Sequence, residues 1–99
     1  MQEKSLQGTL PIGASVIYTC PAGKIGKIAN MRFFNSAAYG IILSRLDALT
    51  GTWVVIYDFT LDPADTVVDN NIYMFKENDS ISVNATVANT DYLLYIVEY

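Results

Sequence analysis

Histidine is absent from this sequence of 99 residues, and cysteine occurs only once, at Cys20. Histidine is the commonest general base in enzymes and the commonest side-chain ligand of transition metals. Its absence excludes Ser-His-Asp and Cys-His catalytic sets as well as histidine zinc sites. A single cysteine cannot form an intramolecular disulfide, which excludes the class of small secreted proteins held together by several disulfides.

Charged residues are also scarce. They make up 16% of the sequence, whereas apolar residues make up 52%; the usual charged share of a soluble domain is ~25%. A chain this short forms one domain, residues 1–99, with a high ratio of surface to volume. So many apolar side chains must be partly exposed or covered by a partner subunit, and the composition therefore predicts a homo-oligomer.

The net charge of −4 and the sequence pI of about 4.4 argue against nucleic-acid binding, which depends on clustered lysine and arginine. No apolar stretch approaches the length of a membrane span, and the first residues lack the apolar region of a secretion signal. We therefore expect no membrane partner, and a location in the cytoplasm or in a particle that is assembled there.

The apolar pattern has period two along most of the chain and is clearest at 80–87, where Ile81, Val83, Ala85 and Val87 alternate with polar residues. Turn signals separate such segments at the spacing typical of a sandwich or barrel. The sequence therefore predicts an all-β, antiparallel β-sandwich of about eight strands. The expected strands lie at 4–10, 15–20, 24–35, 39–46, 53–60, 65–73, 80–87 and 91–99.

The turn at Pro21-Ala22-Gly23 is the most informative of these signals, because proline presets φ and glycine accepts the left-handed position of a short loop. It predicts that 15–20 and 24–35 form an antiparallel hairpin.

Two of the expected strands carry large apolar side chains on both faces. At 53–60, alternation sets Trp53, Val55, Tyr57 and Phe59 against Val54 and Ile56; at 91–99 it sets Leu93, Tyr95, Val97 and Tyr99 against Tyr92, Leu94 and Ile96. One face can fill the core, while the other needs cover from a loop, a subunit or a ligand. The residues expected at a subunit interface are Trp53, Tyr57, Tyr92, Tyr95 and Tyr99.

No catalytic, cofactor or metal site is predicted. Cys20 has no local activating group beyond Lys24 and is expected to be a small core or turn residue. The acids Asp58, Asp62, Asp65 and Asp69 are close in sequence, but they lack the spacing of a calcium loop and are expected to be solvated turn residues. The chain is therefore not expected to be an enzyme or to hold a cofactor. An aromatic platform for sugars, built on Trp53 and the tyrosines, stays open as an alternative.

The segment from Val16 to Asn35 resembles a pattern in small structural proteins of bacteriophages: a strand ending in Y-T-x-P-A-G-K, here 18–24, then a long strand ending in asparagine. Those proteins often continue with a G-D-S-I turn, here 78–81 with Asn78 in place of glycine, and finish on a strand ending in an acidic residue, here Glu98. Asparagine also tolerates positive φ, so the strand order is expected to be unchanged.

This resemblance implies a jelly-roll sandwich located in a virion, as a capsid decoration, head-fibre or tail component. It also implies a symmetric homo-oligomer in contact with other virion proteins. Together with the two-sided apolarity of 53–60 and 91–99, it leads us to favour a trimer. The hypothesis from the sequence is thus a non-enzymatic virion structural protein. The alternative is a carbohydrate- or host-receptor-binding module of a phage fibre.

Overall fold

The computed structural model describes residues 1–99, and all of its regular secondary structure is β-strand. No helix in it is long and apolar enough to cross a membrane. The nine strands are β1 (Gln2–Leu10), β2 (Gly13–Thr19), β3 (Gly26–Phe34), β4 (Tyr39–Asp47), β5 (Thr52–Leu61), β6 (Thr66–Asp69), β7 (Tyr73–Phe75), β8 (Ser80–Ala85) and β9 (Thr90–Glu98).

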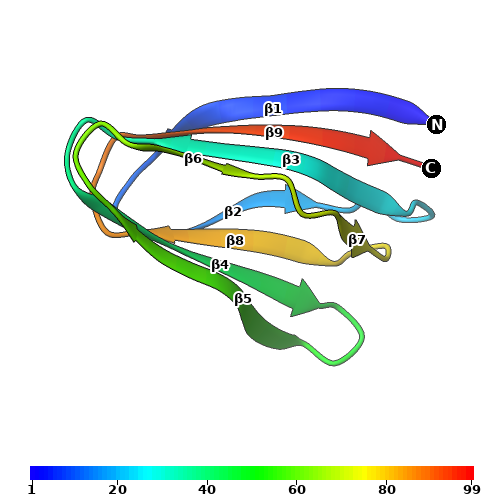
Figure 1. The fold of residues 1–99 in the computed structure, drawn as a ribbon. Helices are drawn as coiled ribbons and strands as arrows, with labels where there is room; N and C mark the ends of the chain where they lie inside the picture. The colour runs from blue at the N-terminus through cyan, green and yellow to red at the C-terminus, as the bar shows by residue number, and fades with distance from the viewer.

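The strands form two antiparallel sheets that lie one over the other (Figure 1). Sheet A has the order β1-β9-β3-β6, with β7 also paired to β3, and sheet B has the order β2-β8-β4-β5. The pairs are nested along the chain: β1 pairs with β9, β2 with β8, β3 with β6 and β7, and β4 with β5. This nesting is the strand order of a jelly roll, which confirms the predicted fold class.

Two details of the sequence prediction were wrong. The expected strand at 65–73 is divided into β6 and β7, because the chain leaves β3 between Asp69 and Tyr73. The expected hairpin between 15–20 and 24–35 does not form, since β2 pairs with β8 in sheet B while β3 pairs with β9 in sheet A. The turn itself is present, with Gly23 at φ 75° and a bond from Lys24 N–H to the Pro21 carbonyl. The turn connects β2 of sheet B to β3 of sheet A. Local turn residues set the reversal of the chain but do not determine which strands pair.

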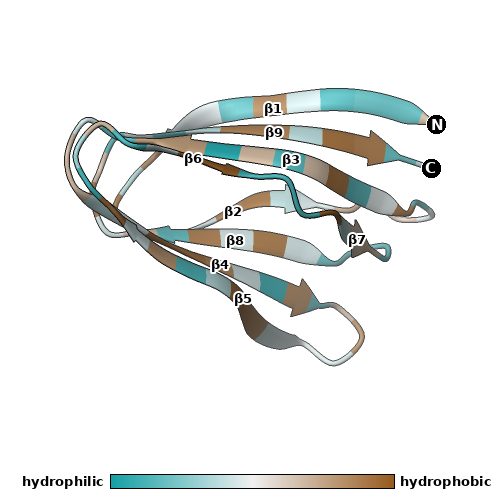
Figure 2. Cartoon of the chain, in the orientation of Figure 1, coloured by the Kyte–Doolittle hydropathy of each residue, from teal (hydrophilic) through white to brown (hydrophobic).

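The core lies between the sheets and consists of 16 buried residues, most of them from alternate positions of the strands. In β8, Ile81, Val83 and Ala85 are buried as the alternation predicts, and in β9 Leu94 and Ile96 are buried. Figure 2 shows this alternation as successive brown and pale bands along the strands. Because only one face of each strand is needed for the core, each sheet also has an outer face.

Buried polar side chains hold the loops at one end of the sandwich. Asn35, directly after β3, donates from its amide to the Ala88 carbonyl and to Thr90 Oγ1, and its side-chain oxygen accepts from Ala37 N–H. All of its bonds reach loops or strand ends, so this asparagine fixes the end of β3 against the connection between β8 and β9.

The turn between β5 and β6 includes an alanine in an unfavourable backbone conformation. Ala64 has φ 63°, which lies in the left-handed region that L-residues with a Cβ avoid, and Asp65 N–H bonds the Asp62 carbonyl around it. We expect Ala64→Gly to raise the free energy of unfolding by about 0.5–1 kcal/mol, since glycine removes the clash at a smaller entropic cost. Urea unfolding at fixed protein concentration measures this.

The matched control is Ala22→Gly, an exposed turn alanine whose φ is not positive. It should give no gain in stability, because glycine there only adds freedom to the unfolded chain. An equal gain in both variants, or a loss in Ala64→Gly, would contradict this explanation of the turn.

Candidate assembly surface

The five aromatic residues predicted for an interface are not brought together on one surface. Trp53 is on the outer face of sheet B, and Tyr57 is on the opposite side of the same strand, in edge contact with Phe59. Tyr92 is on the inner side of sheet A, where it packs against the core. Tyr95 is on the outer face of sheet A, and Tyr99 follows the end of β9. Their part in an interface stays a prediction, but they cannot form one continuous patch.

A β-bulge explains why Trp53 and Tyr57 diverge. Leu43 pairs with Tyr57 and Ser44 with Val55, so Ile56 is an extra residue in β5. An extra residue shifts the alternation by one position. Strict period-two reasoning put Trp53, Val55, Tyr57 and Phe59 on one face, and this was wrong. Trp53 and Val55 face outward, whereas Tyr57 and Phe59 face the inner side.

The outer face of sheet B carries an exposed apolar stripe across its strands. Val16 is 57% exposed, Trp53 45% and Val55 58%, and the half-buried Ile42 lies between them. Together with small residues they line a shallow hollow of about 570 Å³. In Figure 2 the part of β5 that curves away from sheet A is coloured as hydrophobic. We call this outward surface of β2, β8, β4 and β5 the sheet-B face. Its hollow is lined by Ala14, Val16, Ile42, Ser44, Trp53, Val55, Ser82 and Asn84.

The sheet-B face is nearly uncharged. The register places Ser44, Ser82 and Asn84 outward beside the apolar residues, and Asp58, opposite Ile42, is the one charged side chain that points outward from these strands. The central parts of protein interfaces are depleted of charge and enriched in aromatic residues. The sheet-B face therefore has the composition of a protein-binding surface.

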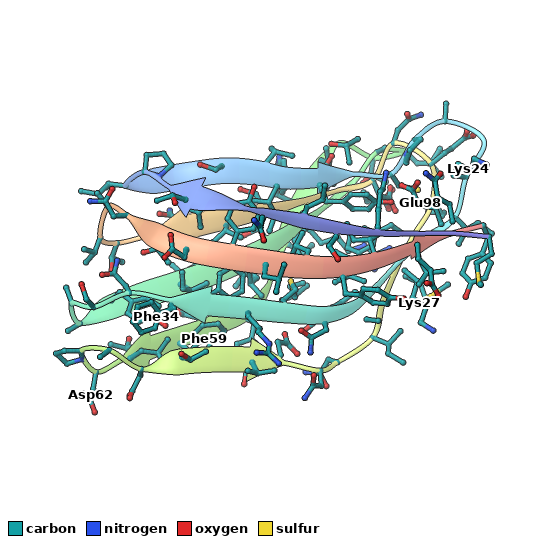
Figure 3. The ribbon with its side chains drawn as sticks, turned by 90° about the horizontal axis from the view of Figure 1, so that it is seen from above. Lys24, Lys27, Phe34, Phe59, Asp62 and Glu98 are labelled. Carbon is teal, nitrogen blue, oxygen red and sulfur yellow. The ribbon has the colours of Figure 1, made fainter.

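The outer face of sheet A is more polar. Glu3, Lys27, Arg32 and Asp91 all point outward from it, by their registers in β1, β3 and β9. Apart from Tyr95 of β9, the exposed apolar residues of this face lie along the border formed by β3, β6 and β7, which we call the sheet-A margin. It consists of Lys27, Arg32, Phe34, Val68 and Met74. Figure 3, which looks onto sheet A, shows Lys27 and Phe34 near opposite ends of β3.

The groups considered for catalysis do not form a reactive set. Cys20 is fully buried, and its thiol lies 3.4 Å from the Lys24 carbonyl oxygen. Asp58, Asp62 and Asp65 are exposed, but Asp69 is buried, which corrects the expectation that all four acids are solvated. Asp69 accepts a bond from the Tyr73 hydroxyl at 2.7 Å. Burial and this bond raise the pKa of Tyr73 to about 12.

A buried carboxylate, Asp79, joins three segments at the end of the sandwich opposite Asn35. It accepts hydrogen bonds from Ala48 N–H at 3.0 Å and from Lys76 N–H at 3.1 Å, and the Arg45 guanidinium is 3.3 Å away. Burial raises the pKa of Asp79, but the two N–H groups and Arg45 outweigh it and hold this pKa below its ordinary value. Asp79 is therefore ionised at neutral pH and stabilises the fold by holding these three segments together.

A second buried carboxylate, Glu98, ends β9 and is 3% exposed. The Tyr18 hydroxyl donates to its Oε2 at 2.7 Å, and Lys4 Nζ lies 3.0 Å from its Oε1. Burial raises the pKa of Glu98, but the Tyr18 bond and Lys4 outweigh it and lower this pKa overall. Burial and the bond to Glu98 in turn raise the pKa of Tyr18. The cluster joins β1, β2 and β9, which belong to different sheets.

Sequence reasoning did not identify Asp79 or Glu98 as buried groups. A charged residue normally indicates an exposed position, and alternation alone cannot show that backbone N–H groups or a tyrosine will satisfy it. One sequence feature could have indicated their structural role: Asp79 lies in the turn motif at 78–81, and Glu98 is the acidic residue that ends the last strand.

Comparison with known proteins gives a likeness in fold. No protein-family model matches the chain, and neither does any curated protein. Among solved structures, the chain is similar to a protein of Bacillus endospore appendages, which are described as "a novel family of disulfide-linked pili". The TM-score is 0.54 at 12% identity, and the match covers 99% of this chain and 84% of the other. At this identity the likeness concerns the fold.

Proposed function

We propose that this protein is a non-enzymatic structural subunit that assembles through the sheet-B face. The observation that carries the proposal is the combination of exposed Val16, Trp53 and Val55 with an almost complete lack of charge on that face. Burying this surface against protein would gain hydrophobic free energy without desolvating ion pairs.

The structural neighbour supports the same class of role, since it is a protein of an assembled appendage. The resemblance in 16–35 and 78–81 leads us to the finer proposal of a virion component: a capsid decoration, head-fibre or tail subunit. For the homo-oligomer we propose a trimer, with other virion proteins as further partners.

The contacts between subunits in this proposal are non-covalent. Cys20 is the only cysteine, and its side chain is fully buried in the folded chain. A disulfide needs two sulfurs within bonding distance, which a buried thiol cannot reach in another subunit. Assembly should therefore be unaffected by a reducing agent.

The proposal is tested by placing a charge on the stripe with Val55→Asp. We expect this variant to weaken self-association by at least roughly 30-fold, because an unpaired carboxylate would be buried at the contact. Sedimentation equilibrium measures the association constant, and circular dichroism establishes that the variant is folded.

Val54→Asp is the matched control. It is the neighbouring residue of the same strand, it is 56% exposed, and it points to the other side, opposite Arg45. It should associate as the unmodified protein does. Equal weakening by both substitutions would show that the effect is not specific to the sheet-B face and would refute the proposal.

A second candidate function rests on the same hollow. Trp53 lies there beside Asn84 and Ser82, and an exposed indole next to amide and hydroxyl groups suits a sugar ring. A carbohydrate- or receptor-binding module would bind on a glycan array and lose that binding in Trp53→Ala. If the unmodified protein bound no glycan on the array, assembly would remain the proposed function of this surface.

A further inference from the structure

The two apolar surfaces of this protein carry opposite charge. On the sheet-B face, the outward charge is the exposed carboxylate of Asp58. On the sheet-A margin, the outward charges are the cations Lys27 and Arg32, next to the exposed side chains of Val68 and Met74. The outward residues of β3, β6 and β7 include no acid.

We propose that the sheet-B face of one copy packs against the sheet-A margin of the next copy, so that the contact between subunits is heterologous. This inference rests on the proposed function and names the partner surface. A contact of the sheet-B face with itself would bring two Asp58 carboxylates to one interface with no cation from either copy. A contact with the sheet-A margin instead supplies Arg32 and Lys27 to Asp58. The nearest outward acid is Asp91 of β9, opposite Phe34, and it accepts a hydrogen bond from Thr9 Oγ1.

The size and placement of the two surfaces agree with this arrangement. The Cα atoms extend over 40 × 27 × 20 Å, so a broad face of the sandwich measures up to 40 by 27 Å. A contact over most of such a face would reach the roughly 800 Å² per partner of a standard stable interface, and the sheet-A margin covers part of one face. Because the two surfaces belong to the outer faces of different sheets, each copy can contact two neighbours at once. Such head-to-tail contacts generate a closed ring, as in a trimer, or an open array.

The heterologous contact predicts complementation between two variants that do not assemble alone. Val55→Asp disables the sheet-B face and Val68→Asp disables the sheet-A margin; Val68 is 43% exposed and lies opposite Arg32. Each variant alone should be monomeric. Mixed in equal amounts, they should form a dimer of one copy of each and nothing larger, because one intact surface of each kind remains between them.

Mass photometry or sedimentation velocity of the two variants and their mixture makes this test, with circular dichroism as the check on folding. Val55→Ser and Val68→Ser repeat it with a smaller disturbance of the strands. A mixture that stays monomeric, or a Val68→Asp variant that assembles like the unmodified protein, would overturn the inference. In the latter case the proposed function would stand if Val55→Asp alone abolished assembly. An unmodified protein that is itself monomeric would refute both.

Discussion

Asp79→Ala is expected to lower the free energy of unfolding by about 3 kcal/mol, because the two N–H groups and the guanidinium that this carboxylate holds lose their partner. The donors come from the connection after β4, from the turn after β7 and from Arg45 within β4. Loss of the Asp79 carboxylate should also lower the Tm by roughly 12–24 °C for a chain of this length. Calorimetry at fixed protein concentration measures both quantities.

Lys76→Ala is the control for this prediction. Its ammonium lies 3.8 Å from Asp47 in an exposed ion pair, while its backbone N–H, which bonds Asp79, is retained in the variant. An exposed ion pair contributes about 0–1 kcal/mol, so the control should change stability little. If Asp79→Ala changed the free energy of unfolding as little as Lys76→Ala, the buried carboxylate would not stabilise the fold as described above.

Glu98→Ala is expected to cost about 2–4 kcal/mol at neutral pH, since it leaves the buried Tyr18 hydroxyl without an acceptor and Lys4 without its carboxylate. The acid dependence of stability should change as well. The pKa of Glu98 is lowered in the folded protein, so its contribution is present above the pKa of the unfolded chain and is lost as the pH falls through the folded value.

The measurement is urea unfolding of the variant and the unmodified protein at several pH values from neutral to acid. The stability difference between them should be largest at neutral pH. It should shrink as the pH falls below the ordinary pKa of glutamate and through the lowered pKa of Glu98 in the folded protein. Glu3→Ala, an exposed acid on the outer side of β1, serves as control and should give a profile like that of the unmodified protein. A difference independent of pH would show that Glu98 acts through packing instead of charge.

The fold class followed from the sequence because burial in a sandwich imposes period two on each strand. That pattern is explicit at 80–87, where Ile81, Val83 and Ala85 are buried and Val87 is half-buried. At 91–99 both faces are apolar, and the sequence did not show which of them is inward. The pairing of β2 with β8, by contrast, is a long-range choice between strands of similar composition. A turn signal such as Pro21-Ala22-Gly23 fixes only a local reversal, and so the hairpin was predicted wrongly.

The candidate surface was predicted only in part for a related reason. That β5 carries apolar residues on both sides was visible in the sequence, and Trp53 does lie exposed on an outer face. The bulge at Ile56 was not visible, because an extra residue leaves composition unchanged and is set by the pairing with β4. The predicted set therefore mixed residues of opposite faces and omitted Val16 and Ile42, which come from other strands.

The motifs that carry the phage resemblance have structural explanations. Asn78 has φ 68°, which fits the position where glycine is common, and the next residue is the buried Asp79. Asn35 and Glu98, at the ends of their strands, are buried and hydrogen-bonded. These residues stabilise the ends of the jelly roll and are not part of its exposed outer faces.

Self-association through the sheet-B face is the central claim, and the mass of the unmodified protein in solution tests it most directly. Multi-angle light scattering across a dilution series should give a mass that is a multiple of the 10.9 kDa chain and that persists into the low micromolar range. A mass of one chain at every concentration, with Trp53 and Val55 freely accessible to solvent, would contradict the account.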